Sequence, residues 1–265
     1  MRTDNKSSKA KILVLITGSI AAVRIPLLVS QLVKDGFEVK CVISENAEKL
    51  IQPLSMSILS RNPSILEKDQ WSNYATRPLH IDLCDWADIL IVAPLTATSL
   101  SKWVTGNADG LIASILIANT KPVVVAPAMN TKMWFNQAVK KNHEILETYN
   151  NVLSLEPSKG ILACDEVGIG KIPNNDLIQL AIEFLIINNQ NHFYKDLQKK
   201  EFLITGGCTL EKIDAARNVT NSSSGTMGLL LAQVARFRGA NVKYIHGPLK
   251  IDREITEGIK RYEIE

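Results

Sequence analysis

Residues 11–16 read Lys-Ile-Leu-Val-Leu-Ile, and this largely apolar run is followed at once by Thr17, Gly18 and Ser19. A strand that is apolar on both sides must be covered on both faces, as the central strands of parallel sheets are. The glycine permits a tight turn, and residues 21–34 then carry apolar side chains at helical spacing before Asp35-Gly36 ends the pattern. A strand, a glycine turn and a helix in this order predict an α/β fold.

The same alternation continues along the chain. We predict further strands at residues 37–43, 89–93 and 123–126, and helices at residues 54–59, 99–117, 136–148 and 177–187. Alternating strands and helices indicate βαβ units and therefore a Rossmann-like doubly wound parallel sheet. In such a sheet the ligand binds outside the carboxyl ends of the strands. This rule directs attention to the residues that follow Ile16, Ile43, Ala93 and Ala126.

A polar stretch at residues 188–192 separates this pattern from a second one. Residues 200–208 repeat the outline of residues 11–19, and we predict a helix at 227–238 and a strand at 241–246. We therefore expect one domain at 1–190, a linker at 191–198 and the start of a second Rossmann-like α/β domain at 199–265. Because about 67 residues are too few for a doubly wound domain, we expect the second domain to be truncated.

The composition argues against several classes of protein. Lys and Arg number 30 against 27 Asp and Glu, and a net charge of +3 is too small for a nucleic-acid-binding or membrane-surface protein. The four cysteines form no CxxC pair and the four histidines show no metal-ligand spacing. We therefore expect no metal site and a reducing, cytoplasmic setting. The apolar run at 12–23 is too short to span a bilayer, and its internal glycine and serine favour a buried strand over a signal peptide.

The turn after the first strand is a candidate anion site. Backbone N–H groups at a helix start, together with the hydroxyl of Ser19, can bind a phosphate. Gly18 is the only glycine there, so a mononucleotide phosphate fits better than the pyrophosphate of a dinucleotide. Ser44, after the second strand, could add a hydroxyl to this phosphate. Glu45 could instead bind a ribose, and an ordinary strand-to-helix turn remains the plain alternative.

Polar side chains also follow the later strands. Thr96, Thr98 and Ser99 precede a predicted helix, where they can cap the helix or bind a polar ligand. Asn130 lies among apolar Met and Trp residues. Its amide can donate to a substrate carboxylate, although a turn residue beside the core would look the same.

Two further residues have the chemistry of a catalytic group. His80 lies at the predicted start of a helix and could act as a general base, although a lone histidine is more often structural or exposed. Cys164 lies between Gly160 and Gly168 in a glycine-rich segment that is typical of a mobile flap. Its thiol could donate a proton or attack a substrate, or it could be a small buried side chain in a loop.

Five segments in order carry a resemblance to a known family. They are Gly18-Ser-Ile-Ala, His80-Ile-Asp-Leu, Pro94-Leu-Thr-Ala-Thr-Ser, Pro127-Ala-Met-Asn-Thr-Lys-Met-Trp and Ala163-Cys-Asp-Glu-Val-Gly-Ile-Gly. With them, residues 11–185 resemble the homo-oligomeric flavin-containing cysteine decarboxylases, above all the phosphopantothenoylcysteine decarboxylases of coenzyme A biosynthesis. Residues 200–250 resemble the start of the phosphopantothenate–cysteine ligases, which in bacteria are commonly fused to these decarboxylases.

The resemblance implies an FMN-dependent decarboxylation of 4′-phosphopantothenoylcysteine to 4′-phosphopantetheine. A cysteine carboxylate has no electron sink, and oxidation of the substrate to a thioaldehyde creates one before carbon dioxide leaves. The implied base is His80, and Cys164 is the implied proton donor. Asn130 would hold the substrate carboxylate, with Met133 and Ala163 beside it. The implied FMN contacts are Gly18, Ser19, Ile20, Ser44, Thr96, Ala97, Thr98, Ser99 and Ala128.

The resemblance also implies partners, and this sequence differs from the family at two positions. It implies a small-molecule substrate, no nucleic acid, no membrane and a homo-oligomer based on trimers. CTP and Mg²⁺ would bind only to a complete ligase domain, so we expect no ligation by this chain. The residues that match the opening of that domain are Gly206, Gly207, Asp214, Arg217 and Asn221. Thr98 replaces an amide of the family and Cys208 replaces a proline.

Three other interpretations stay open. An NAD-type oxidoreductase would use Glu45, but the single glycine of the first turn argues against it. A non-catalytic flavoprotein regulator of the same family would typically have a long acidic tail, whereas residues 191–265 are net basic. A flavin prenyltransferase of related fold is disfavoured by His80 and by the Met-Asn-x-x-Met-Trp segment.

Overall fold

The computed structural model describes residues 9–72, 76–188 and 195–264. Contacts divide the chain into two compact units, residues 1–192 and 193–265, and each unit is described by itself. The predicted linker at residues 191–198 lies partly outside the described residues.

A six-stranded sheet forms the centre of the first unit, with the strand order β3-β2-β1-β4-β5-β6 and every pairing parallel. Its strands are β1 (Lys11–Ile16), β2 (Glu38–Ile43), β3 (Ile65–Leu66), β4 (Ile89–Leu95), β5 (Val123–Pro127) and β6 (Val152–Ser154). The order reverses between β1 and β4, which is the point where doubly wound sheets bind their ligands. The predicted doubly wound parallel sheet is confirmed.

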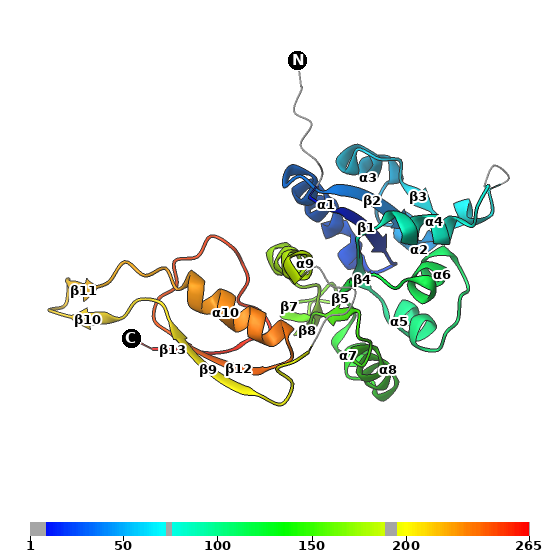
Figure 1. Cartoon of the computed structure of the whole chain (residues 1–265). Coiled ribbons are helices and arrows are strands. Elements are labelled where there is room, and N and C mark those ends of the chain that lie inside the picture. Colours follow the sequence, from blue (N-terminus) through cyan, green and yellow to red (C-terminus); the bar gives the residue numbers. More distant parts are fainter. Residues whose placement is uncertain (1–8, 73–75, 189–194, 265) are drawn as a thin grey trace, which may run out of the picture. The chain divides into compact units, whose positions relative to one another are not determined.

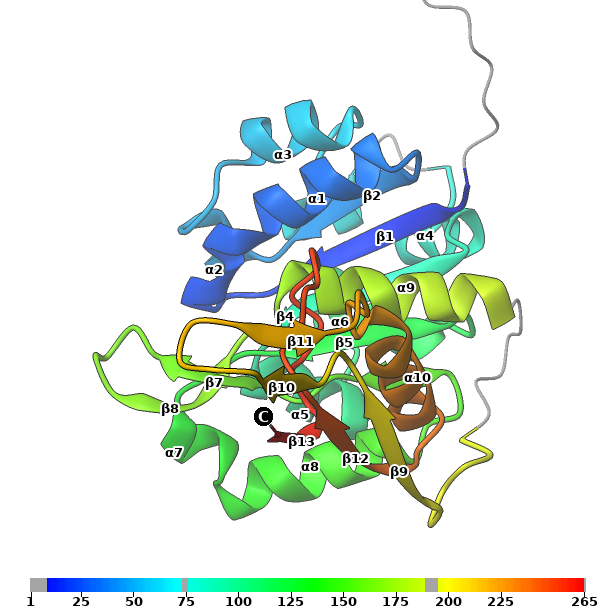
Figure 2. The same cartoon turned by 90° about the vertical axis from the view of Figure 1, so that its left-hand side faces the viewer.

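Helices cover both faces of this sheet (Figure 1). On one face α1 packs against α3 and α9, and Figure 2 shows α1 and α3 side by side. On the other face α6 packs against α4 and α5, and α5 packs against α8. The bounds of the helices are η1 (Ile20–Arg24), α1 (Ile25–Lys34), α2 (Glu45–Glu48), α3 (Pro53–Ser60), η2 (Glu67–Trp71), α4 (Leu79–Trp86), α5 (Ala97–Val104), α6 (Leu111–Ala118), α7 (Thr131–Trp134), α8 (Gln137–Glu147) and α9 (Asn175–Asn188).

The two helical layers explain the unbroken apolar run of β1. Residues 12–16 are fully buried, and alternate residues of the strand point to opposite faces. Leu13 and Leu15 pack in one cluster with Leu90 and Trp103. Each such side chain contributes about 1.5–3 kcal/mol when buried, so the central strands dominate the stability of this unit.

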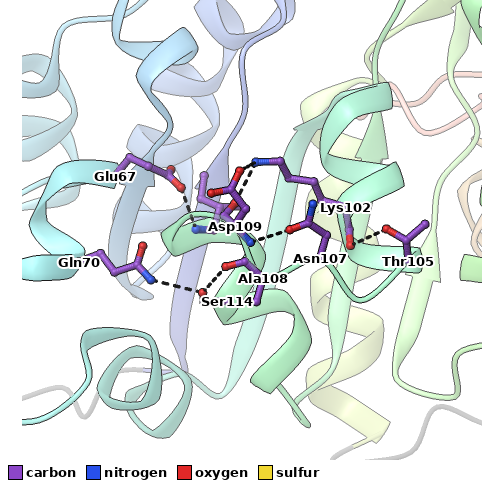
Figure 3. Close-up of polar contacts among 9 residues, drawn as sticks. Glu67, Gln70, Lys102, Thr105, Asn107, Ala108, Asp109 and Ser114 are labelled. Atoms are coloured by element: carbon purple, nitrogen blue, oxygen red, sulfur yellow. Dashed lines mark hydrogen bonds and ion pairs between the residues drawn. The ribbon is translucent and has the colours of Figure 1, made fainter.

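The predicted single helix at residues 99–117 is wrong, because the structure divides it into α5 and α6. Gly106 (φ 71°) follows the end of α5, and Gly110 (φ 99°) precedes α6 without a side chain that could cap it. Glu67 of η2 supplies the missing cap, since its Oε1 accepts the N–H of Ile112 at 3.4 Å (Figure 3). Two glycines in left-handed conformations are therefore the physical reason for the break.

The second unit has a three-stranded parallel sheet with the order β13-β12-β9 and one helix, α10, packed on β9 and β12. Tyr244 is fully buried beneath α10, and its hydroxyl donates to the carbonyl of Gly225 at 3.0 Å. A two-stranded antiparallel ribbon, β10–β11, completes the unit. The bounds are β9 (Glu201–Gly206), β10 (Leu210–Lys212), β11 (Asn218–Thr220), α10 (Thr226–Phe237), β12 (Asn241–His246) and β13 (Lys260–Glu263). The predicted second α/β domain is confirmed.

None of the helices in the described ranges combines the length and apolarity that a bilayer crossing requires.

The break between α5 and α6 generates a stability prediction. A Cβ at Gly110 would overlap Glu67 Oε1, whereas a Cβ at Gly106 would meet nothing within 4 Å. Gly106→Ala should therefore lose only the cost of its left-handed backbone, about 1–2 kcal/mol. Gly110→Ala should lose about 1–3 kcal/mol more, because Glu67 must give up its cap. Urea unfolding of both variants measures the difference, and equal losses would show that Glu67 does not hold the start of α6.

Candidate functional site

The carboxyl ends of β1 and β4 meet at the point where the strand order reverses. Thr17, which follows β1, is buried. Its Oγ1 donates to the carbonyl of Pro94 at 2.6 Å and accepts the N–H of Thr96 at 3.2 Å. These two hydrogen bonds join the turn after β1 to the turn after β4, and the predicted site residues lie around this junction.

Four of the predicted site residues cap the helix that follows their strand. The backbone N–H groups of Ala21, Ala47, Ser99 and Lys132 donate to Ser19 Oγ (3.4 Å), Ser44 Oγ (3.3 Å), Thr96 Oγ1 (3.3 Å) and Asn130 Oδ1 (2.8 Å). The capping hydroxyls of Ser19 and Ser44 each use a lone pair and keep their own proton, so they can still donate to a ligand. The Thr96 hydroxyl instead donates its proton to Ser99 Oγ at 3.1 Å. Capping and ligand binding are therefore compatible at Ser19 and Ser44.

A polar cavity of about 350 Å³ lies beside the junction. The predicted residues that line it are Gly18, Ser44, Thr96, Thr98 and Ser99. A Cβ at Gly18 would overlap the Cβ of Asn46, so glycine is required for the close approach of the first turn to α2. Helix N-termini and hydroxyls around one cavity can bind an anion.

Charged side chains that the sequence reasoning missed line the same cavity (Figure 3). Lys102 binds Asp109 at 2.8 Å and holds the pKa of that carboxyl below its usual range. Burial raises the pKa of Glu67, and its Oε2 is a buried oxygen without a hydrogen-bond partner among the described residues. Lys102 therefore already has a carboxylate partner inside this cavity, and an anionic ligand would have to share or displace it.

A second cavity, of about 470 Å³, is lined mainly by apolar side chains. It brings together six of the predicted residues, namely Ser19, Ile20, Ala128, Asn130, Ala163 and Cys164. Such a cavity suits a flat apolar ring with a few polar groups at its edge.

The predicted flap is an antiparallel hairpin of β7 (Ser158–Ile161) and β8 (Val167–Lys171). The N–H of Met129 donates to the carbonyl of Gly170 at 3.0 Å, so the hairpin is bonded to the turn after β5. Cys164 lies exposed between the two strands, and Asn130 Nδ2 donates to its Sγ at 3.4 Å. The amide of Asn130 is thereby oriented at both ends, with Oδ1 on α7 and Nδ2 on the thiol.

Three predicted residues line neither cavity. His80 is the second residue of α4 and is half-buried, Met133 is 48% exposed on α7, and Ala97 is the first residue of α5. Their roles stay predictions.

In the second unit the matched residues make local contacts. Gly206 ends β9 against Tyr244, whose hydroxyl oxygen would crowd any Cβ there. Asp214 accepts the N–H groups of Ala216 and Arg217 at 2.9 and 2.8 Å, and the Arg217 side chain lowers the pKa of this carboxyl. Asn221 Oδ1 accepts the backbone N–H of Ser223 at 2.9 Å. Gly207 follows β9 in a left-handed conformation (φ 87°). These contacts shape the ribbon β10–β11 and the turns beside it.

All four cysteines are free thiols, and no group of three or more His, Cys, Asp or Glu in residues 9–72, 76–188 and 195–264 could hold a metal ion.

Two family models match the chain. The model described as flavoprotein matches residues 1–186, and the model described as DNA/pantothenate metabolism flavoprotein C-terminal domain matches residues 197–265.

Curated relatives match most of the chain. The coenzyme A biosynthesis bifunctional protein CoaBC of Bacillus subtilis is 38% identical over 248 residues, which cover 91% of this chain and 58% of that protein. The protein of the same description from Borreliella burgdorferi is 39% identical over 238 residues, which cover 89% of this chain and 59% of that protein. The chain therefore spans less than two thirds of the length of these relatives.

Solved structures resemble the first unit. A PPC decarboxylase mutant complexed with pantothenoylaminoethenethiol has a TM-score of 0.60 and 31% identity, and the match covers 66% of this chain and 96% of that one. The FMN binding protein AtHal3 has a TM-score of 0.60 and 32% identity, and the match covers 69% of this chain and 100% of that one.

The attachment of the hairpin generates a second prediction. Gly160 and Gly168 are paired across β7 and β8, but a Cβ at Gly168 would overlap Thr131 Oγ1, whereas one at Gly160 would lie 3.1 Å from the flexible Lys171 side chain. Gly168→Ala should loosen β8 and increase amide hydrogen exchange there and at residues 129–131. Gly160→Ala, as the matched control, should leave this exchange nearly unchanged. Equal exchange in both variants would contradict the attachment.

Proposed function

This chain belongs to the flavoprotein family, and we propose that its first unit is an FMN-dependent decarboxylase of coenzyme A biosynthesis. The proposed reaction converts 4′-phosphopantothenoylcysteine to 4′-phosphopantetheine and carbon dioxide. The observation that carries the proposal is the pair of adjoining cavities at the turn after β1. One is polar, one is apolar, and Asn130 and Cys164 are hydrogen-bonded in the second.

The residues of the two cavities fit FMN. The polar cavity offers helix N-termini and the hydroxyls of Ser44 and Ser99 to a phosphate and a polyhydroxyl chain. The apolar cavity offers Ile20 and Ala128 to a flat ring. When bound, FMN supplies a two-electron acceptor that returns the electrons within the same catalytic cycle. Thr98 stands in the polar cavity where the family has an amide, and its hydroxyl can replace only one of the two donors of that amide.

Three residues of this chain carry the proposed chemistry. Asn130 has two amide protons. One is donated to Cys164 Sγ, and the other is available to the substrate carboxylate. His80 removes a proton from the substrate, and Cys164 returns a proton to the carbon that loses carbon dioxide. The apolar walls exclude water, which favours the loss of charge when a carboxylate leaves as a neutral gas.

We propose a homo-oligomer built on trimers because His80 lines neither cavity of its own chain. A neighbouring copy would then supply the histidine. Ile20 and Val23, at the edge of the apolar cavity, are 55% and 51% exposed, which fits a subunit boundary at this place. The proposed location of this enzyme is the cytoplasm.

We propose that residues 199–265, within the second unit, are the opening part of a phosphopantothenate–cysteine ligase domain. CTP and Mg²⁺ are the proposed ligands of the complete domain. Its matched residues Asp214 and Arg217 hold the ribbon β10–β11 in shape here, which supports a scaffolding role for this pair.

The test of the proposed reaction uses two variants of the flavin-loaded protein. His80→Asn should reduce carbon dioxide release at least about 100-fold, because general-base catalysis is lost. Cys164→Ser should still release carbon dioxide but accumulate an oxidised enethiol product. Mass spectrometry of the products, with flavin absorbance followed in parallel, separates the two. Equal full turnover by both variants would contradict the assignment, and a wild-type protein without flavin or carbon dioxide release would end the proposal.

Subunit mixing tests the origin of the histidine. Coexpression of His80→Asn with Cys164→Ser creates sites in which one chain supplies an intact Cys164 and the next an intact His80. Turnover to 4′-phosphopantetheine should reappear in these mixed oligomers. If each variant's defect persists in mixed oligomers, His80 acts within its own chain or not at all.

A further inference from the structure

The apolar cavity contains an unusual balance of charge. Among the described side chains that line it, only Arg24 and Lys171 are charged, and both are cationic. Neither forms an ion pair with another residue in the part of the chain that the structure describes. In the polar cavity, by contrast, the one lysine is bound to Asp109.

The structure keeps these two cations beside the cavity by different means. Arg24 is the last residue of η1 and directly precedes α1, so the first turn after β1 sets its position. Lys171 is half-buried at the end of β8, and its side chain crosses the partner strand over Gly160, where a Cβ would lie 3.1 Å from its Cδ. The absence of a side chain at Gly160 thus leaves room for the lysine stem.

Arg24 is exposed at the mouth of the cavity and Lys171 is half-buried, so both can reach a ligand there. Beside apolar walls their attraction for an anion is screened less than in water, so a negatively charged ligand gains free energy by binding beside them. A neutral ligand of the same shape gains nothing from them. The cavity is therefore built for a substrate that carries negative charge in addition to its reacting group.

We infer that Arg24 and Lys171 are substrate-binding residues that form an anion-binding pair in the apolar cavity and select acyl-cysteine substrates by their negative charge. The identity of this substrate rests on the proposed function above, and the two residues and their role go beyond it. A terminal phosphate and a cysteine carboxylate are the two anions that such a substrate offers. Asn130 already provides a neutral donor for the carboxylate, and two cations match the charge of about −2 of a phosphate.

The experiment compares two probes on the FMN-loaded protein by isothermal titration calorimetry. 4′-Phosphopantetheine has the phosphate without the carboxylate, and pantothenoylcysteine has the carboxylate without the phosphate. The variants are Arg24→Gln, Lys171→Met and the double variant. Lys159→Met, which changes an exposed lysine of the same hairpin outside the cavity, is the matched control. Flavin absorbance and far-ultraviolet circular dichroism show that each variant is folded and loaded.

Each single variant should weaken one probe at least about tenfold, the double variant should weaken it further, and Lys171→Arg should restore most of the affinity. A loss confined to 4′-phosphopantetheine identifies the phosphate as the bound anion, and a loss confined to pantothenoylcysteine identifies the carboxylate. Unchanged affinity for both probes in the double variant would overturn the inference, as would a wild-type protein that binds neither probe.

The outcomes also separate the inference from the proposed function. If the wild-type protein binds a probe through Arg24 and Lys171 but releases no carbon dioxide from the full substrate, the proposed reaction fails and the anion pair stands. If the wild-type protein turns over and the double variant binds both probes as tightly as Lys159→Met does, the reaction stands and the anion pair is wrong.

Discussion

The buried hydroxyl of Thr17 joins the turn after β1 to the turn after β4, and the rest of the site depends on this junction. Thr17 uses both its proton and a lone pair, donating to Pro94 and accepting from Thr96, so it pays no penalty for a polar group left unsatisfied in the core. These bonds set the distance between the turn after β1 and the turn after β4. Ser19 and Thr96 cap the helices on either side, so their positions follow from this one contact. The polar cavity lies where the two turns diverge.

The central strands and most helices could be predicted because their patterns are local. The apolar run at residues 12–16 predicts a buried strand, and the helical spacing of apolar residues in α8 predicts a helix, without reference to any distant residue. The division between α5 and α6 could not be predicted in this way. A glycine inside a helical pattern is often tolerated, and the decisive cap comes from Glu67, 45 residues before its partner Ile112. The glycines of residues 160–170 indicated a flap, but the strands β7 and β8 within it were not predicted, because they are short and their alternation is weak.

Some residues of the candidate site could likewise be predicted from local patterns, and others could not. Ser44, Thr96 and Asn130 could be found from the rule that ligands bind beyond the carboxyl ends of parallel strands, and each lies beside a cavity or caps a helix there. Arg24 and Lys171 could not, since they lie on a helix end and a hairpin, and only the tertiary structure brings them to one cavity. The role of His80 came from resemblance, and its place outside both cavities was invisible to sequence patterns.

The way the hairpin β7–β8 is attached has a consequence for how such a protein can diversify. The polar cavity is built from turns that the sheet itself positions, whereas the apolar cavity is closed by an excursion that enters and leaves the fold within residues 158–171. Its bond from Met129 to Gly170 uses backbone atoms only, so it survives most changes of side chain in the hairpin. Replacement of residues 161–163 would thus reshape the apolar cavity while the turns that line the polar cavity stay in place. The turns of the polar cavity can therefore stay constant while part of the hairpin varies in sequence.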